Sequence, residues 1–187
     1  GYGYRLEAIE IKMVEKNGEV PGPTTRPFVK YPTVSYQTHV QNVGWQNDVS
    51  NGDSSGTTGQ SLRLEGIKIQ LTDLPYAGSI SYSTHIQNIG WQNDVSDGLL
   101  SGTTGLELRL EAIKIKLNGE MANNFDIYYR VHAQNFGWMG WAKNGEPAGT
   151  AEYSYRSEAI QIKIIPKGSE APGNTTGAFV VNPKVVL

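Results

Sequence analysis

The sequence of 187 residues contains no cysteine, which excludes disulfides, thiolate nucleophiles and cysteine-ligated metal sites. It also has no excess of positive charge, because 16 Lys and Arg residues stand against 18 Asp and Glu residues. Binding to the phosphate backbone of nucleic acid depends on such an excess. No apolar run approaches the roughly 18 residues of a membrane-spanning helix. We therefore expect neither nucleic acid as a partner nor membrane insertion.

Methionine is scarce, whereas glycine, proline and aromatic residues are common. The chain has 3 Met, 22 Gly, 9 Pro and an aromatic share of 10%. This composition favours short strands joined by tight turns over a helix bundle. No segment shows a helical period with capping residues, and the sequence therefore predicts an all-β protein.

A unit of about 46 residues occurs three times, which indicates a repeat architecture. Residues 34–71 and 80–117 are nearly the same, and their histidine, tryptophan and arginine residues all lie 46 positions apart. A looser third copy begins at Ile127 and follows with a step of 47. Three full units are therefore expected to form one module.

Longer matches at a step of 151 residues link the two ends of the chain. Residues 4–11 match residues 155–162, the second half of a unit, and the Pro/Gly/Thr-rich residues 21–32 match residues 172–183. We interpret the chain as a fragment or a processed product of a longer array. The predicted divisions are 1–33 (second half of a preceding repeat plus a linker), 34–165 (three repeats, 34–79, 80–126 and 127–165) and 166–187 (a linker and the start of a further repeat).

Each unit contains two predicted strands. In the first, apolar residues alternate with polar ones from Val34 to Gln41, as in a strand with one buried face. In the second, Leu62 to Leu71, the inward side changes at Glu65-Gly66, which predicts a β-bulge or a corner. A β-trefoil closes with three such units and is the expected architecture, with a linear β-repeat array or a propeller-like fold as the alternatives.

The N-terminal segment Tyr4–Val14 resembles the second strand of a unit without its first. A lone strand with an apolar face is unstable in water. We therefore expect this strand to pair with an exposed edge of the module or of a neighbouring molecule.

The motif H-V-Q-N-x-G-W-Q, followed by turns and by L-R-L-E-x-I-x-I-x-L, resembles the clostridial hydrophobic repeat with a central Trp, the ChW repeat. The match covers the three full units and the N-terminal half unit. The family usually has a second aromatic residue a few positions after Gly-Trp, as Trp141 in the third unit, and the first two units depart from it with Asp48 and Asp94. The resemblance implies a bacterial cell-surface or secreted, extracellular protein with a binding or adhesive role.

Polar and aromatic residues that recur in every unit are the candidate ligand contacts. The repeated histidines and glutamines could bind a sugar or peptide, or could make hydrogen bonds that hold the fold. The tryptophans could pack in the core or stack on a sugar ring, and Trp141 is expected to be exposed. The candidates are His39, Gln41, Trp45, His85, Gln87, Trp91, His132, Gln134, Trp138 and Trp141.

No residue set stands apart as a catalytic site, so we expect no enzyme and no cofactor. The three histidines could meet on a pseudo-threefold axis, but no metal site is predicted. The Arg63/Glu65 pair and its copies are expected to be local, exposed ion pairs. Repeated sites favour multivalent binding of a glycan or cell-envelope polymer. The alternative is a structural subunit that associates end to end with other copies through its terminal half repeats.

Overall fold

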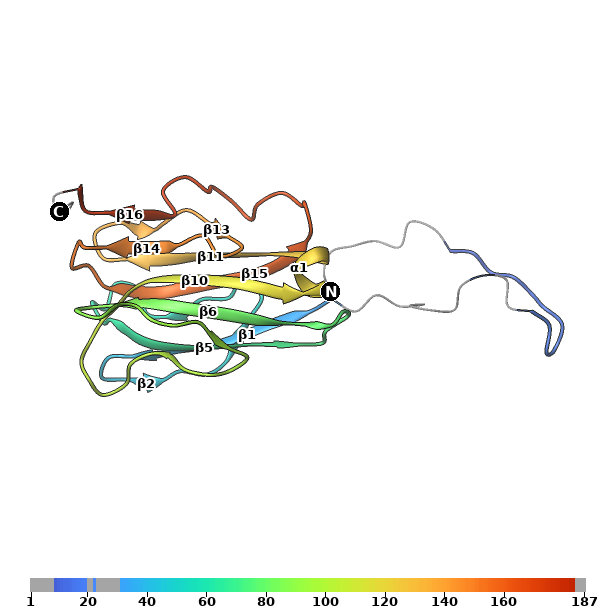
Figure 1. Cartoon of the computed structure of the whole chain (residues 1–187), viewed down its shortest axis with the longest axis horizontal. Helices are drawn as coiled ribbons and strands as arrows, with labels where there is room; N and C mark the ends of the chain where they lie inside the picture. The colour runs from blue at the N-terminus through green and yellow to red at the C-terminus, as the bar shows by residue number, and fades with distance from the viewer. Residues whose placement is uncertain (1–8, 20–21, 23–30, 184–187) are drawn as a thin grey trace.

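Three long antiparallel hairpins, one from each repeat, form the body of the protein. The computed structural model describes residues 9–19, 22 and 31–183. Strand β1 (Thr33–Val40) pairs with β5 (Leu64–Thr72), β6 (Gly78–Ile86) with β10 (Leu110–Gly119), and β11 (Phe125–Ala133) with β15 (Ser157–Pro166). These six strands run along the long axis of the molecule (Figure 1).

Short strands connect the two halves of every hairpin. They are β2 (Gly44–Trp45), β3 (Val49–Ser50), β4 (Ser55–Gly56), β7 (Gly90–Trp91), β8 (Val95–Ser96), β9 (Ser101–Gly102), β12 (Gly137–Trp138), β13 (Ala142–Lys143) and β14 (Ala148–Ala151). A further short strand, β16 (Phe179–Val181), follows the last hairpin. A five-residue helix, α1 (Glu120–Asn124), joins the second hairpin to the third. The sequence analysis expected no helix, and this one is too short to produce a helical period.

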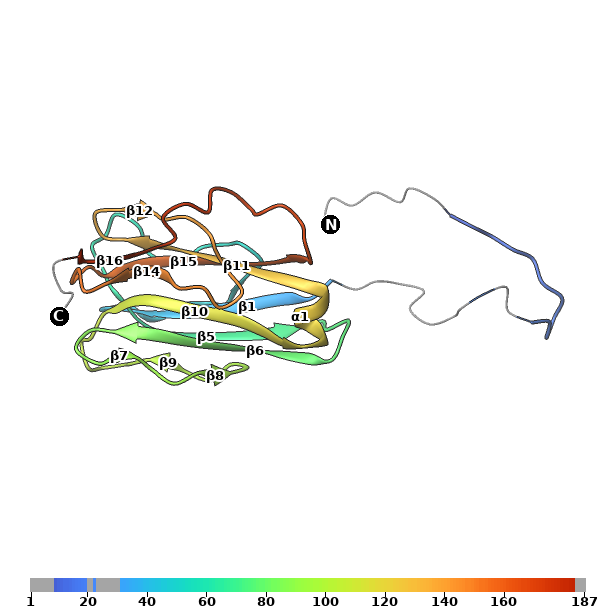
Figure 2. The same cartoon turned by 45° about the horizontal axis from the view of Figure 1, so that its top comes forward.

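The hairpins belong to three sheets, and each repeat contributes a short strand to a sheet of another repeat. Strand β9 of the second repeat pairs with β5 of the first, β14 of the third pairs with β10 of the second, and β4 of the first pairs with β15 of the third. The exchange therefore forms a closed cycle. Figure 2 shows the long strands of the three hairpins after a turn of the molecule. The all-β class and the three repeats are confirmed, whereas the β-trefoil is not.

The predicted change of inward side in the second strand is a β-bulge. His39 lies opposite Gly66 and Val40 lies opposite Leu64, so Glu65 is the extra residue of β5. Strands β10 and β15 have the same irregularity at Glu111 and Glu158. Since a bulge turns the side chain of the extra residue, it allows each glutamate to face the histidine of the neighbouring strand.

Three buried tyrosines, Tyr36, Tyr82 and Tyr129, lie in the core, and the first two make hydrogen bonds between repeats. The hydroxyl of Tyr36 donates to the carbonyl of Asp53 in its own repeat and accepts the N–H of Ile162 of the third repeat at 3.0 Å. Tyr82 makes the same pair of contacts, with Ile69 of the first repeat as donor. Burial raises the pKa of Tyr36 to about 12 and also raises the pKa of Tyr82. These hydroxyls therefore stay protonated and hydrogen-bonded over the physiological pH range.

The N-terminal prediction concerns residues 4–14, of which residues 4–8 lie outside the described part. Residues 9–14 form no strand and pair with no edge of the module, and Ile9, Ile11 and Met13 are exposed. Pairing within the molecule is therefore wrong for this part, while pairing with a neighbouring molecule stays a prediction. The expected start of a further repeat at residues 185–187 also lies outside the described residues.

Candidate binding site

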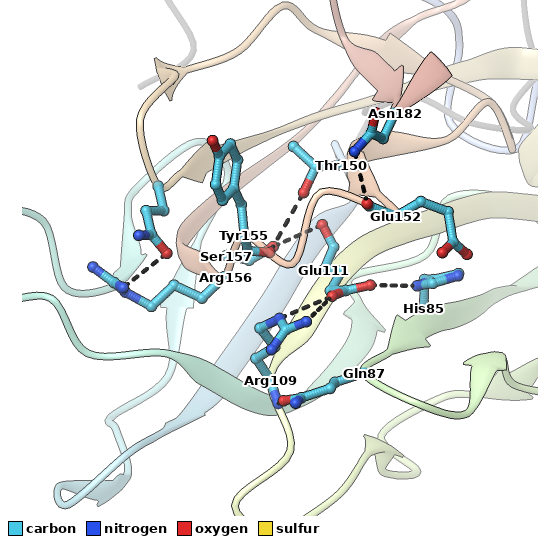
Figure 3. A network of polar contacts seen from close by, with 11 residues as sticks. His85, Gln87, Arg109, Glu111, Thr150, Glu152, Tyr155, Arg156, Ser157 and Asn182 are labelled. Carbon is cyan, nitrogen blue, oxygen red and sulfur yellow. Dashed lines mark hydrogen bonds and ion pairs between the residues drawn. The ribbon is translucent and has the colours of Figure 1, made fainter. Parts of the chain in front are cut away.

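A buried glutamate holds an arginine and a histidine in every repeat. In the second repeat, Glu111 Oε1 accepts from Arg109 Nε at 2.8 Å and lies 2.7 Å from Nη2, while Oε2 lies 3.0 Å from His85 Nδ1 (Figure 3). Glu111 is only 4% exposed. His85 Nδ1 is itself buried and lies at hydrogen-bond distance from this carboxylate. The cluster is therefore a buried charge group, and the exposed ion pair predicted from the sequence is wrong.

The other two repeats copy this cluster. Glu65 lies 3.1 Å from His39 Nδ1 and 2.8 Å from Arg63 Nη2, and Glu158 contacts His132 and Arg156 at the same distances. The burial of each glutamate follows from the bulge at its position. The sequence pattern Arg-x-Glu was visible, but its burial depends on the opposite strand.

In each repeat, the ring of the cluster histidine packs against the tryptophan of the next short strand. Trp45 lies opposite His39 on β2, and the two rings meet edge to face at a centroid distance of 5.4 Å. The Nζ of Lys68 lies 4.6 Å from the centroid of the Trp45 ring, a cation–π contact. Trp45 is 36% exposed, so it is a surface residue and not a core residue. The second repeat repeats these contacts with His85, Trp91 and Lys114.

The candidate glutamines make contacts within the fold. Gln41 and Gln87 accept from the backbone N–H of Arg63 and Arg109 at 3.5 and 3.4 Å. Gln134 instead accepts from Arg156 Nη1 at 2.8 Å. These side chains therefore tie the end of the first strand to the arginine of the cluster.

Open grooves lie beside the tryptophans of the first two repeats. The groove at Trp45 has a volume of about 410 Å³ and the groove at Trp91 about 480 Å³, in the range of small-ligand sites. Both have largely polar walls that include an exposed asparagine, Asn47 or Asn93. The sequence analysis missed Asn47 and Asn93, although their recurrence directly after Gly-Trp-Gln was available as a signal.

The third repeat differs from the first two in the residues that follow its Gly-Trp pair. Trp141 is buried, with 6% of its surface exposed, so the prediction that it is exposed is wrong. Arg130 lies over both the Trp138 and the Trp141 ring, at 4.8 Å from each centroid. The backbone N–H of Trp141 also donates to the carbonyl of Asn174 at 2.9 Å. Trp141 is therefore covered by a segment that is distant in the sequence.

A buried carboxylate anchors the beginning of that segment. Asp126 is fully buried and lies 3.0 Å from Lys143 Nζ and 2.9 Å from Lys167 Nζ. It also accepts from Asn144 Nδ2 and from the backbone N–H of Gly168. Burial alone would raise the pKa of Asp126, but these donors together outweigh it and hold the pKa well below its usual range.

We expect Asp126→Asn to lower the free energy of unfolding by about 2–4 kcal/mol at pH 7, because it leaves buried donors without a charged partner. A carboxyl group with a lowered pKa stabilises the fold above its ordinary pKa and loses this contribution as the pH falls below it. The difference between wild type and variant should therefore shrink by roughly 1 kcal/mol at pH 3. Urea unfolding at pH 3 and pH 7 measures the difference in unfolding free energy between wild type and variant. An equal difference at the two pH values would contradict this account of Asp126.

Within residues 9–19, 22 and 31–183, no three His, Asp or Glu side chains are grouped so that they could hold a metal ion. No helix of this part is long and apolar enough to cross a membrane.

The interlocked sheets and the recurring glutamate clusters define an all-β protein built from tandem tryptophan-containing repeats. A comparison with protein families matches the family described as ChW, clostridial hydrophobic W, at residues 39–73, 85–119 and 132–166. These segments make up more than half of the chain, and the protein belongs to the ChW family. No curated protein and no solved structure matches the chain.

Proposed function

We propose that the protein is a non-catalytic, secreted or cell-surface module of bacterial origin that recognises cell-wall or host glycans through equivalent sites on its repeats. The observation that carries this proposal is the open groove beside the exposed Trp45 in the first repeat and beside the half-buried Trp91 in the second. The expected trefoil arrangement of the three repeats is a finer part of the same proposal.

The chemistry of the grooves suits a polymer of sugar units. An indole ring supplies an apolar wall, and exposed asparagine side chains offer both donors and acceptors to hydroxyl groups. The indole of Trp45 is held between His39 and Lys68 and does not need to be ordered when a ligand binds. Two weak sites on one molecule would raise its overall affinity for a repetitive polymer, because binding at one site raises the effective concentration of the polymer at the other.

A glycan array, combined with sedimentation on insoluble cell-wall polymer, tests the proposal. We expect at least one polymer to bind above background and the double variant Trp45→Ala/Trp91→Ala to lose most of this binding. Leu106→Ala is the control because this side chain is 63% exposed and lies outside both grooves. A wild-type protein without any bound glycan, or a double variant that binds like wild type, would refute the proposal.

A structural subunit of a tandem surface array is the second candidate. The exposed apolar residues Ile9, Ile11 and Met13 support it, because a neighbouring molecule could cover them. Light scattering over a range of concentrations distinguishes this candidate, since a strict monomer at high concentration counts against an array.

A further inference from the structure

The C-terminal segment 172–183, here named the tail, lies along the third repeat as an added strand. Strand β16 pairs in parallel with β14, where Gly149 lies opposite Phe179. The N–H of Gly149 donates to the carbonyl of Ala178 at 2.9 Å, and the N–H of Asn182 donates to that of Ala151 at 3.1 Å. Figures 1 and 2 both show β16 beside β14. The tail is therefore bound by β-augmentation, a common mode of peptide recognition.

The surface that receives the tail consists of Gly140, Trp141 and the edge of β14, with Trp91 of the second repeat beside Phe179 at a ring-centroid distance of 6.5 Å, and we call it the docking surface. A Cβ atom on Gly140 would lie 2.3 Å from the carbonyl oxygen of Thr176, so the close approach requires glycine. A Cβ atom on Gly173 would lie 3.2 Å from Trp141 Nε1, so the tail also passes close to the indole. The fit depends on small residues on both sides.

The first two repeats replace the docking surface with a different arrangement. Gln46 stands at the place of Met139, and its Oε1 accepts the N–H of Gly56 at 2.6 Å. In the third repeat the equivalent N–H, that of Gly149, donates to the tail instead. Asn47 stands at the place of Gly140. The side chain of Gln46 therefore accepts the N–H of β4 that corresponds to the N–H of β14 accepted by the tail. Among the described residues, only the third repeat has a docking surface.

The sequence of the tail occurs a second time, at residues 21–32, most of which lie outside the described residues. Seven of the twelve positions are identical in the two copies. The shared residues are Pro21/Pro172, Gly22/Gly173, Thr24/Thr175, Thr25/Thr176, Phe28/Phe179, Val29/Val180 and Pro32/Pro183.

At two of the five positions that differ, the tail contacts the docking surface only through a carbonyl group. Asn174 and Ala178 accept the N–H groups of Trp141 and Gly149 through their carbonyl oxygens. Residues 21–32 have Pro23 and Pro27 at these two places. Since proline lacks only the N–H and keeps its carbonyl, both acceptors are preserved.

Three differences weaken the second copy. Pro23 lacks the side-chain oxygen with which Asn174 accepts the N–H of Thr176. Tyr31 lacks the amide group with which Asn182 donates to the carbonyl of Glu152.

At the third difference, Gly177 has φ +68°, and Arg26 stands at its place before Pro27. A residue with a side chain is disfavoured in this conformation, and a following proline disfavours it further. The tail should therefore hold the docking surface of its own chain more strongly than residues 21–32 would.

We propose that residues 21–29 of one molecule dock on the docking surface of a second copy and exchange there with the tail. The chain has two segments of this pattern and, among the described residues, one surface that fits them. Only three residues of the tail pair with β14, and residues 173–177 are exposed, so the tail can leave without unfolding the sheets. The exchange links the N-terminal end of one molecule to the third repeat of the next.

Binding of a labelled peptide with the sequence of residues 20–32 tests the proposal by fluorescence anisotropy. The acceptor is the full chain with the tail weakened by Phe179→Ala and Val180→Gly, and a peptide of residues 171–183 is the positive control. We expect the weakened acceptor to bind both peptides and the wild-type chain, whose surface is filled, to bind them at least tenfold more weakly. Arg26→Gly in the peptide should tighten binding by roughly tenfold.

Gly140→Asn in the weakened acceptor is the matched control. It places on the third repeat the residue that the first two repeats hold there, and thermal melting shows whether the variant folds. Binding of both peptides should then fall at least tenfold. The proposal is wrong if the acceptor binds the 171–183 peptide but not the 20–32 peptide, if it binds neither, or if a folded Gly140→Asn acceptor binds as before.

Discussion

Gly102→Ala should destabilise the whole three-repeat module, with a loss of about 4 kcal/mol in the free energy of unfolding. Gly102 has φ +110°, and a Cβ atom there would lie 2.5 Å from the carbonyl oxygen of Glu65 and 2.6 Å from the Cα of Gly66. Neither backbone atom can move without opening the pairing of β9 with β5. Thermal melting should show a fall of roughly 10 °C in Tm.

Gly105→Ala is the matched control for this prediction. Gly105 belongs to the same turn sequence and has φ +71°, but a Cβ atom there would meet no atom within 4 Å. Its replacement should cost only the backbone strain, about 1–2 kcal/mol. Equal losses for the two variants would show that strain alone matters and that contact between repeats contributes nothing.

Glu111→Ala should cost about 3–5 kcal/mol, because it leaves Arg109 and His85 without their buried partner. His85 is 8% exposed and cannot recover full contact with water in the folded state. The variant should also loosen Trp91, whose ring rests on His85. Urea unfolding measures the first effect, and quenching of tryptophan fluorescence by iodide measures the second.

Glu107→Gln serves as the reference, because Glu107 is an exposed residue of the same repeat. Its replacement should change stability by less than about 0.5 kcal/mol. A loss below about 1 kcal/mol for Glu111→Ala would mean that the cluster behaves as an ordinary surface ion pair.

Local patterns were enough to predict the long strands and a bulge or corner in the second strand of each unit. The alternation from Val34 to Val40 and the change of inward side at Glu65 follow from the period of a strand, and both are present in the structure. The assignment of short strands to other repeats could not be predicted in this way. A two-residue strand such as Ser55–Gly56 has no period, and its partner, β15, lies about 100 residues away in the chain.

The candidate site was predicted in composition but not in arrangement. The recurring His and Trp were recognised, whereas the buried Glu65 was assigned to an exposed pair, because burial depends on the opposite strand. Trp141 was predicted to be exposed because its counterparts are Asp48 and Asp94. That argument fails because the tail covers Trp141. The available signal was the change from Gln-Asn-Asp in the first two repeats to Met-Gly-Trp in the third.

The number of glycan sites on one molecule tests the central proposal most directly. Isothermal titration of the full chain with a short oligosaccharide cut from the polymer that it binds should give two sites per molecule, one at each open groove. Trp45→Ala should leave one site whose affinity is unchanged, because the grooves belong to separate repeats. A stoichiometry of one in the wild type, or of two in Trp45→Ala, would contradict multivalent recognition through these grooves.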